Sequence, residues 1–353
     1  FLIDHTKIGL KDKAYFFHLL AVMVDAGIPV LQALSVLSGK TENRRFQRII
    51  NTLAHSTSTG NSLSDSMARF PDAFTDAEIG VVRAGEAAGN LNKMLFRLSD
   101  QIERSHELQV KLITAATYPF VILITLVVIT IGMMIWIVPT LLNLLVEGGL
   151  SESEFPIATR ILLAVSSFLT SWWWAVILFI LILFGVYRVY RSTEVGNFQT
   201  DYFILKIPVI GVLVRKVLVL RFISLLGILL EAGLPVIKSL QIIGASINSA
   251  PYEAKTREVI KKVSEGEKIS DNLMKSPFLF PETVTEMINI GESTASVGTI
   301  SEKIANHYDR EIDHTLRRLT SLFEPIMILV VGTIIALLAL AILMPIFSLT
   351  EIV

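Results

Sequence analysis

The stretch FFHLLAVMVDAGIPVLQAL, residues 16–34, returns later in the chain as FISLLGILLEAGLPVIKSL, residues 222–240. Eight of these 19 aligned positions are identical, at an offset of 206 residues. Self-similarity at a fixed offset is the signature of a duplicated structural unit. The same offset aligns further turn residues in each copy, including Gly60 with Gly266 and Pro71 with Pro277. The chain therefore contains one unit that is present twice.

An Ala-Gly-Ile/Leu-Pro corner lies inside each quoted stretch. Gly27 and Gly233 suit the left-handed residue that follows a helix. Pro29 and Pro235 suit the first position of the next helix, where a missing N–H costs nothing. The apolar residues around these corners recur with helical rather than alternating spacing. We expect each copy to form an all-helical bundle of about five or six helices.

A second helix–helix corner follows in each copy. Its residues are Gly85, Glu86 and Gly89 in the first copy and Gly291, Glu292 and Gly298 in the second. This alignment predicts three extra residues in the second corner. For the two glutamates we keep two interpretations: the carboxylates cap nearby backbone N–H groups, which is a favourable place for a negative charge, or they contact a partner protein or the other copy.

Three long runs without a charged residue predict membrane-spanning helices. They cover 35 residues at 112–146, 27 residues at 161–187 and 26 residues at 325–350. A helix needs roughly 20 apolar residues to cross the hydrocarbon core of a bilayer. The chain as a whole has only 18% charged residues, against about 25% in a typical soluble domain. The fold class expected is an all-α integral membrane protein with three spans.

The charges that flank these runs predict the orientation. Basic residues precede the first run, follow the second and precede the third, whereas the loop between the first two is acidic. Lys and Arg accumulate on the cytoplasmic side, so we expect the N-terminus inside and the C-terminus outside. The segments expected are bundle 1 at 1–112, span 1 at 113–146, an outer loop at 147–160, span 2 at 161–187, bundle 2 at 188–318 and span 3 at 319–350.

Four prolines and one glutamate in or beside the spans are candidate functional residues. Pro119 aligns with Pro325, and Pro139 with Pro345. Pro139 and Pro345 should bend their helices, because each removes one backbone hydrogen bond. Such a bend is either a tolerated kink or part of a groove for a partner helix. Glu324, directly before Pro325, either pairs with nearby arginines or lipid headgroups or contacts a partner.

Catalytic chemistry is not indicated. The net charge is −1 and there is no cysteine, which argues against nucleic-acid binding and excludes thiolate sites. SGKT at 38–41 has the tail of a phosphate-binding loop, but Leu34 stands where its first glycine belongs. His307 and His314 could share a helix face, yet a solvated surface is the preferred interpretation. We expect no enzyme activity, no cofactor and no metal.

The beginning of the chain carries no sign of a secretory signal. Five charged residues fall within the first fifteen positions, where a signal peptide would carry its apolar core. The chain starts with Phe1 rather than Met, so we expect further residues ahead of it.

The duplicated corners, the GEAAGNL segment at 85–91 and the order bundle–span–span–bundle–span resemble the inner-membrane platform family of type IV pilus and type II secretion machines. The resemblance covers nearly the whole chain. It implies a non-enzymatic, multi-pass protein of the bacterial inner membrane. The partners it implies are a hexameric secretion ATPase on the cytoplasmic side, pilin or pseudopilin helices in the membrane and other assembly proteins. A homo-oligomer is expected as well, because three spans leave much packing surface for further copies.

Two other classes remain as alternatives. A small-solute transporter or channel subunit is suggested by the parallel repeat. Against it, three spans give little wall for a pathway, and none carries a central charge. A membrane receptor or sensor is the third hypothesis, for which the 14-residue outer loop offers a small ligand surface.

Overall fold

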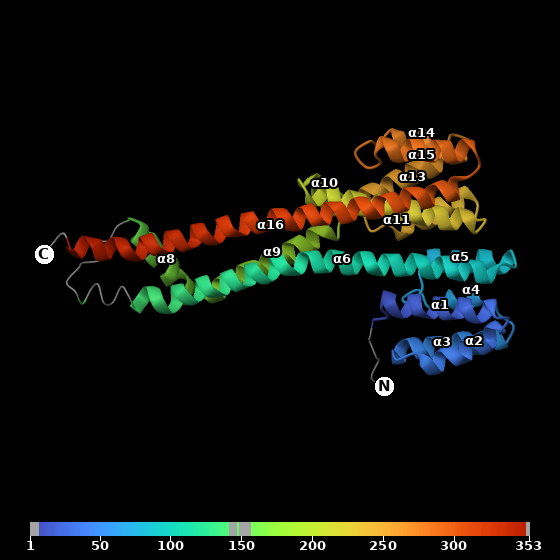
Figure 1. The fold of residues 1–353 in the computed structure, drawn as a ribbon, viewed down its shortest axis with the longest axis horizontal. Helices are drawn as coiled ribbons and strands as arrows, with labels where there is room; N and C mark the ends of the chain where they lie inside the picture. Colours follow the sequence, from blue (N-terminus) through green and yellow to red (C-terminus); the bar gives the residue numbers. More distant parts are fainter. Residues whose placement is uncertain (1–6, 141–146, 148–156, 351–353) are drawn as a thin grey trace. The chain divides into compact units, whose positions relative to one another are not determined.

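The computed structural model describes residues 7–140, 147 and 157–350, and every regular element among them is helical (Figure 1). The chain divides into two compact units. Unit 1 combines Phe1–Lys111 with Phe198–Thr315, and unit 2 combines Leu112–Asn197 with Leu316–Val353. The sequence-based boundary of bundle 2 at 188 therefore differs from the structure, in which this part of unit 1 begins at Phe198.

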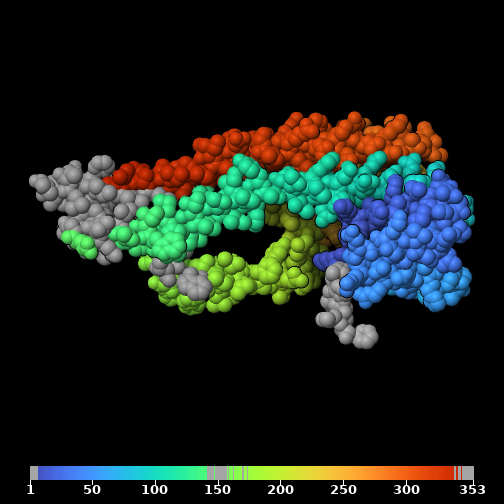
Figure 2. Space-filling view, turned by 60° about the horizontal axis from the view of Figure 1, so that its bottom comes forward, coloured from blue at the N-terminus to red at the C-terminus, as the bar shows by residue number. Residues whose placement is uncertain are grey.

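The first bundle of unit 1 consists of five short helices and the beginning of a long one; Figure 2 shows the short helices in blue as one compact body. Asn43 accepts hydrogen bonds from the backbone N–H groups of Arg45 and Phe46 and so caps the third helix. Thr75 and Glu78 form a capping box at the fifth helix. The helices are α1 (Leu10–Asp25), α2 (Val30–Lys40), α3 (Arg44–Ser58), α4 (Leu63–Met67), α5 (Asp76–Ala87) and α6 (Leu91–Gly132).

The second bundle repeats the first almost residue for residue. Helices α12, α13 and α15 have the bounds of α2, α3 and α5 shifted by 206 residues. The N-terminus of the α3 counterpart is capped by an added helix that precedes the repeated ones: Asp201 of α10 accepts a hydrogen bond from the backbone N–H of Ala250. The helices here are α10 (Glu194–Lys206), α11 (Ile210–Glu231), α12 (Val236–Ser246), α13 (Ala250–Ser264), α14 (Ile269–Met274), α15 (Glu282–Ser293) and α16 (Val297–Thr350).

Aromatic side chains fill both cores at equivalent positions. In the first bundle Phe16 packs edge-on against Phe46, with ring centroids 5.3 Å apart. In the second, Tyr252 takes the place of Phe46 and packs against Phe280 at 5.3 Å. The Tyr252 hydroxyl is buried and donates a hydrogen bond to the Leu279 carbonyl at 2.7 Å, so its polar group is satisfied inside the core.

The two Ala-Gly-Ile/Leu-Pro corners have nearly the same backbone. Gly27 and Gly233 have φ of +79° and +86°, a region that costs a residue with a Cβ atom. One detail of the prediction is wrong. Pro29 and Pro235 are the N-cap residues, with ψ of 139° and 142°, and the helices begin one residue later. Neither position needs a backbone N–H, so proline is tolerated at both.

The predicted three-residue insertion in the second corner is also wrong. In the first corner Gly89 has φ +66°, and in the second the left-handed residue is Ala295 at φ +51°, which keeps the offset of 206. The hydrogen bonds agree: Asn90 N–H donates to the Gly85 carbonyl, and Ser296 N–H donates to the Gly291 carbonyl. Gly298 lies inside α16 instead. The sequence alignment placed glycine on glycine, whereas the backbone accepts alanine here at some strain.

Unit 2 contains the apolar helices. Three helical stretches are long and apolar enough to cross a membrane: Leu91–Thr140, Trp174–Arg191 and Val297–Leu337. The first and third of these stretches begin with α6 and α16, so the last helix of each bundle runs on into the span that follows it. The second predicted span, 161–187, is broken at Trp172 into α8 (Ile157–Ser171) and α9 (Trp173–Arg191). Trp172 has φ −119° and ψ 19°, outside the helical region.

Candidate functional site

Glu86 and Glu292 each hold the start of a short helix in their own bundle. Glu86 accepts hydrogen bonds from the backbone N–H groups of Leu63 at 2.6 Å and Ser64 at 3.2 Å. These two groups belong to the first turn of α4, whose N–H groups have no intrahelical acceptor. Because both carboxylate oxygens of Glu86 are occupied, a partner contact at this residue would compete with the cap.

The second bundle repeats this arrangement. Glu292 accepts from the backbone N–H groups of Ile269 at 2.7 Å and Ser270 at 2.9 Å, and from the Ser270 hydroxyl at 2.5 Å. This is the capping geometry that the first interpretation describes. Contact of either glutamate with a partner protein stays a prediction.

Gly85 and Gly291 let the last helix of each bundle start close to the corner. A Cβ atom on Gly85 would lie 2.9 Å from the Cβ of Met94, and one on Gly291 would lie 3.0 Å from the Cα of Val297. Contacts this short require the helices to move apart. These glycines therefore set how closely α5 packs on α6 and α15 on α16.

The prolines of the first span have different surroundings. Pro119 lies inside α6, which continues as a helix through it. Pro139 follows η1 (Met133–Ile137), a segment of π-helix in which the backbone takes an extra residue per turn. Pro139 has no N–H and its ring crowds the carbonyl four residues earlier, so the wider turn beside it relieves both effects.

A polar contact joins the first two apolar segments at this π-segment. The Ser166 hydroxyl of α8 donates to the Met134 carbonyl at 2.5 Å, and the Ser166 side chain is buried. π-Segments are frequent at functional sites. Beside Pro139 the helix therefore changes from α to π and contacts the neighbouring helix α8. That Pro139 shapes a groove for a partner helix stays a prediction.

The remaining span residues belong to α16. Pro325 is exposed and lies within α16, as does Pro345. Glu324 is exposed, and among the described residues no ion pair joins it to Arg317 or Arg318. Residues 148–156 of the predicted outer loop at 147–160 lie outside the described residues.

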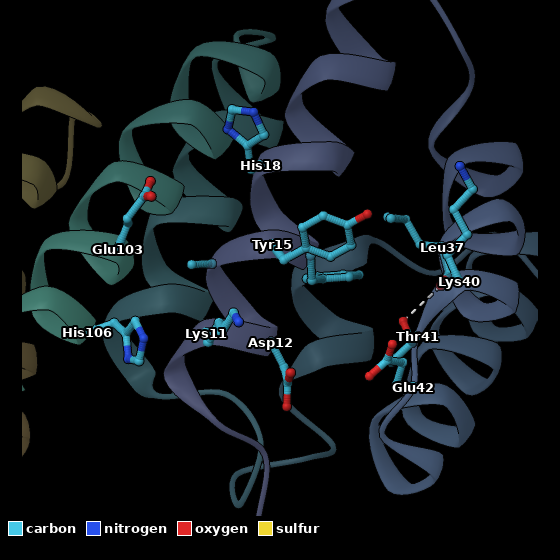
Figure 3. A pocket seen from close by; sticks show the side chains of 12 residues that line it. Lys11, Asp12, Tyr15, His18, Leu37, Lys40, Thr41, Glu42, Glu103 and His106 are labelled. Carbon is cyan, nitrogen blue, oxygen red and sulfur yellow. Dashed lines mark hydrogen bonds between the residues drawn. The ribbon is translucent and has the colours of Figure 1, made fainter. Parts of the chain in front are cut away.

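A groove of about 610 Å³ opens on the first bundle between α1, the end of α2 and α6 (Figure 3). Tyr15 points into it, and Glu103 and His106 line it from α6. Lys40 of the SGKT segment lies at its edge, at the C-terminal end of α2. A phosphate-binding loop needs a helix N-terminus after the glycine-lysine pair. The segment therefore does not have the geometry of a nucleotide site.

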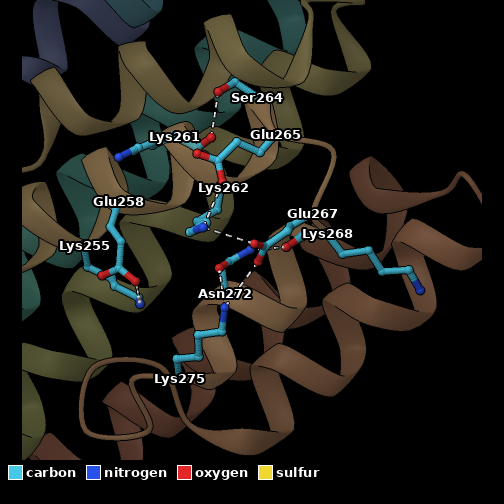
Figure 4. Close-up of polar contacts among 10 residues, drawn as sticks. All are labelled: Lys255, Glu258, Lys261, Lys262, Ser264, Glu265, Glu267, Lys268, Asn272 and Lys275. Carbon is cyan, nitrogen blue, oxygen red and sulfur yellow. Dashed lines mark hydrogen bonds and ion pairs between the residues drawn. The ribbon is translucent and has the colours of Figure 1, made fainter.

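The second bundle carries a network of lysine and glutamate side chains on its surface (Figure 4). Lys262 contacts Glu265 at 2.8 Å and Glu267 at 3.3 Å, and Lys275 contacts Glu267 at 3.3 Å. These contacts raise the pKa of Lys262, while hydrogen bonds from Asn272 and Lys275 lower the pKa of Glu267. Three of the four equivalent residues of the first bundle are uncharged, namely Ser56, Thr59 and Asn61, and only Arg69 keeps the charge of its counterpart Lys275. Exposed pairs of this kind contribute little to stability, so the network distinguishes the surfaces of the two bundles.

Ion pairs that the sequence did not indicate join the two bundles. Arg97 of α6 contacts Glu231 of α11 at 3.4 Å and Glu302 of α16 at 3.2 Å. Lys111 contacts Asp313 at 3.0 Å. The bundles also meet where Gly80 of α5 allows α12 to pack closely, since a Cβ at Gly80 would lie 3.2 Å from the Cδ1 of Ile242. These residues are 134 to 205 positions apart in the chain, and nothing local in the sequence relates them.

The fold and the residues described define a class: a multi-pass helical membrane protein with a duplicated bundle-and-span unit. Comparison with known proteins places it more closely. The family model "Type II secretion system (T2SS), protein F" matches residues 16–139 and again residues 222–345, which are related by the same offset of 206. The chain belongs to this family, as its resemblance at the duplicated corners indicated.

Named relatives come from both kinds of machine. The chain is 34% identical over 340 residues to the type IV pilus assembly protein PilC of Thermus thermophilus, covering 96% of this chain and 83% of that protein. It is 28% identical over 348 residues to PilC of Pseudomonas aeruginosa, with 98% and 92% covered. It is 27% identical over 348 residues to the type II secretion system protein F of Pseudomonas aeruginosa, with 98% and 84% covered.

Proposed function

We propose that this chain is the non-enzymatic inner-membrane platform of a type IV pilus or type II secretion machine, where it couples a cytoplasmic hexameric ATPase to the insertion or extraction of pilin subunits. The observation that carries the proposal is the family match over both bundle-and-span units. Each bundle continues into its span as one helix. A connection by helical backbone rather than by a loop supports the coupling of each bundle to its span.

The orientation supports the coupling. Arg188 and Arg191 occupy the last turn of α9, and basic residues mark the cytoplasmic side of a span. Both bundles then lie in the cytoplasm with the C-terminus outside. Fusions at the C-terminus test this: alkaline phosphatase should be active and green fluorescent protein dark. The reverse result would place the bundles outside, away from any ATPase, and would overturn the coupling.

Deletion of the gene in its own bacterium tests the role. We expect loss of surface pili by electron microscopy if the machine is a pilus, or loss of secreted exoproteins if it is a secretion system. The higher identity to PilC favours pili. Restoration by the intact gene is the control. Normal pili together with normal secretion in the deletion strain would refute both forms of the proposal.

Direct binding tests the partners. The purified full chain in nanodiscs should hydrolyse no ATP and should retain the hexameric ATPase encoded in the same genome. The ATPase of an unrelated machine serves as the matched control. Solute uptake into liposomes that contain the chain alone would support the transporter alternative instead. Failure to retain the cognate ATPase would remove the coupling while leaving membership of the family intact.

A further inference from the structure

The two bundles of one chain meet through different faces. The α6 helix of the first bundle contributes Arg97, Arg104 and Lys111. The α16 helix of the second contributes their partners, which are Glu302 at 3.2 Å, Asn306 at 2.7 Å and Asp313 at 3.0 Å, respectively.

These contact residues are not equivalent in the duplicated unit. Shifted by 206, Arg97 and Arg104 correspond to Lys303 and Arg310 of α16, which lie outside this contact. A symmetric pairing would use the same face of both helices. The contact is therefore head to tail. We call the face with Arg97, Arg104 and Lys111 the basic face of the first bundle, and the face with Glu302, Asn306 and Asp313 the receiving face of the second. By the duplication each bundle has both faces, and the contact within the chain uses one of each.

Two faces are consequently left uncovered. The basic face of the second bundle carries Lys303 and Arg310, and both side chains are exposed. The receiving face of the first bundle carries Asp100, Glu103 and Glu107 on α6, which are exposed as well. Asp100 stands at the border of this face, since it also lines the small cavity at the contact between the two bundles. Beside them opens the groove of Figure 3. The equivalent groove of the second bundle lies between α11 and α16. It is lined in addition by residues of the first bundle's α6, among them Gln101, Arg104 and Leu108.

The contact between copies can be predicted by letting the two bundles exchange roles. Each residue of the intrachain contact is then replaced by its counterpart 206 positions away. The contact of Arg104 with Asn306 becomes Arg310 with Asp100, and that of Arg97 with Glu231 becomes Lys303 with Asp25. Both exchanged pairs have opposite charges. The contact of Arg97 with Glu302 becomes Lys303 with Phe96, which has no charge pair but allows the lysine stem to pack on the ring.

One part of the intrachain interface has no counterpart. The second bundle carries Glu286 where the first has Gly80, so α15 cannot approach another copy's α2 as closely as α5 approaches α12. Contact between copies would then run along α6 and α16. It would be smaller and more sensitive to salt than the contact within a chain.

We propose that a second copy of this chain docks head to tail on the first, with Lys303 and Arg310 of one copy's α16 seated against Asp25, Asp100 and the neighbouring acidic residues of the other copy's first bundle. A head-to-tail contact continues from copy to copy and closes into a ring where the rotation permits. The proposal does not depend on a pilin or an ATPase, so its outcome is separate from that of the proposed function.

The absence of cysteine from the chain makes cross-linking a clean test. Full-length Arg310→Cys and Asp100→Cys chains carrying different tags are co-expressed and treated in the membrane with a short bis-maleimide reagent. We expect a cross-linked heterodimer. The double variant Arg310→Cys/Asp100→Cys should give a ladder of multimers. The matched control pairs Arg310→Cys with Asp72→Cys, an exposed position elsewhere in the same bundle, and should give neither product.

Two outcomes overturn the proposal. A dimer formed by Arg310→Cys alone would indicate a symmetric contact, and cross-linking of the double variant only within one chain would remove the contact between copies. Arg104→Cys/Asn306→Cys shows what such an intrachain product looks like, since this pair lies within one chain.

Charge reversal at Arg310 and Asp100 tests whether these two residues pair. The readout is a cross-link between cysteines placed at the other predicted pair, Lys303 and Asp25. Arg310→Glu should lower the yield of this cross-link about fivefold, and Arg310→Glu with Asp100→Lys should restore it. Arg257→Glu, a reversal on α13 away from both faces, is the control and should leave the yield unchanged. A yield insensitive to Arg310→Glu, or lost without rescue, would refute the assigned pair.

Discussion

At the scale of single residues, the duplication offers a comparison that one bundle alone would not. The first bundle buries an ion pair, Lys13 with Glu78 at 2.7 Å, and both side chains are less than a tenth exposed. The equivalent positions of the second bundle hold Val219 and Val284, each 1% exposed. One backbone thus accepts either a buried charge pair or two apolar side chains. Buried pairs are costly to form and more costly to break.

We predict that Lys13→Val alone destabilises the chain by about 3–5 kcal/mol, because Glu78 would be left charged and buried. The triple variant Lys13→Val/Thr75→Pro/Glu78→Val copies the second bundle and should be at least as stable as the parent. Proline is included because Glu78 also accepts from the Thr75 N–H, and proline has no N–H to leave unpaired. The measurement is the thermal unfolding midpoint in detergent. A triple variant as unstable as the single one would contradict the prediction.

The capping glutamates give a second prediction. Glu86→Ala should cost about 1–3 kcal/mol, because the buried N–H groups of Leu63 and Ser64 lose their acceptor. Hydrogen exchange of these amides should rise in the variant, and Glu292→Ala should raise exchange at Ile269 and Ser270 instead. Glu103→Ala, an exposed site on α6, is the control. If Glu86→Ala abolished function with amide exchange unchanged, Glu86 would be a partner contact rather than a cap.

At the scale of elements, the helices that leave the bundles are the distinctive feature. Both α6 and α16 continue into apolar segments without a break. The second apolar segment differs, since it breaks at Trp172 and its first part, α8, contacts the first segment at the π-turn before Pro139. The uninterrupted helices and the broken segment therefore lie in different parts of the chain.

The hydrogen bond at this joint can be tested. Ser166→Ala removes the donor to the Met134 carbonyl and should cost about 0.6 kcal/mol, the average for side-chain hydrogen bonds between helices in membranes. Ser167→Ala is the matched control, because Ser167 is exposed and donates to Ala164 of its own helix. Thermal unfolding of the purified chain should show a small decrease for Ser166→Ala only. Equal decreases for both would mean that the interhelical bond contributes nothing.

At the scale of the whole molecule, the contact between bundles depends on one missing side chain. Gly80 leaves room for Ile242, and the equivalent position in the second bundle is Glu286. Gly80→Glu should separate α5 from α12, since the side chain is too large for a close-packed contact and its charge would be buried there. Hydrogen exchange in α12 and at Gly233 should increase at least tenfold, a change of about 1.4 kcal/mol in local opening.

Gly80→Ala and Glu286→Gly complete this test. The alanine Cβ would lie 3.2 Å from Ile242, a tight contact with the end of a flexible side chain, so only a small change is expected. Glu286 is exposed, so Glu286→Gly should leave α12 unaffected. Unchanged exchange in Gly80→Glu would mean that the ion pairs of α6 hold the bundles together without α5.

Much of the fold was predictable from the sequence because its signals are local or repeat at a fixed distance. Long uncharged runs indicate spans, since few other structures tolerate them. The duplicated glycine-proline corners indicate helix ends, since backbone conformation at Gly27 and Gly233 depends on the residue itself. The family resemblance rested on the same residues, and the family model matches both copies, at 16–139 and 222–345.

The register of the second corner and the contact between bundles were decided only by the tertiary structure. A left-handed alanine at 295 gives no signal in the sequence, since glycine is the residue expected there. Lys13 with Glu78, and Arg97 with Glu231 and Glu302, are far apart in the chain and meet only after the helices pack. The sequence by itself determined the helices, the spans and the duplication, because these depend on each residue's own preference for backbone conformation and solvent. Which faces meet depends on pairs of residues that only packing brings together.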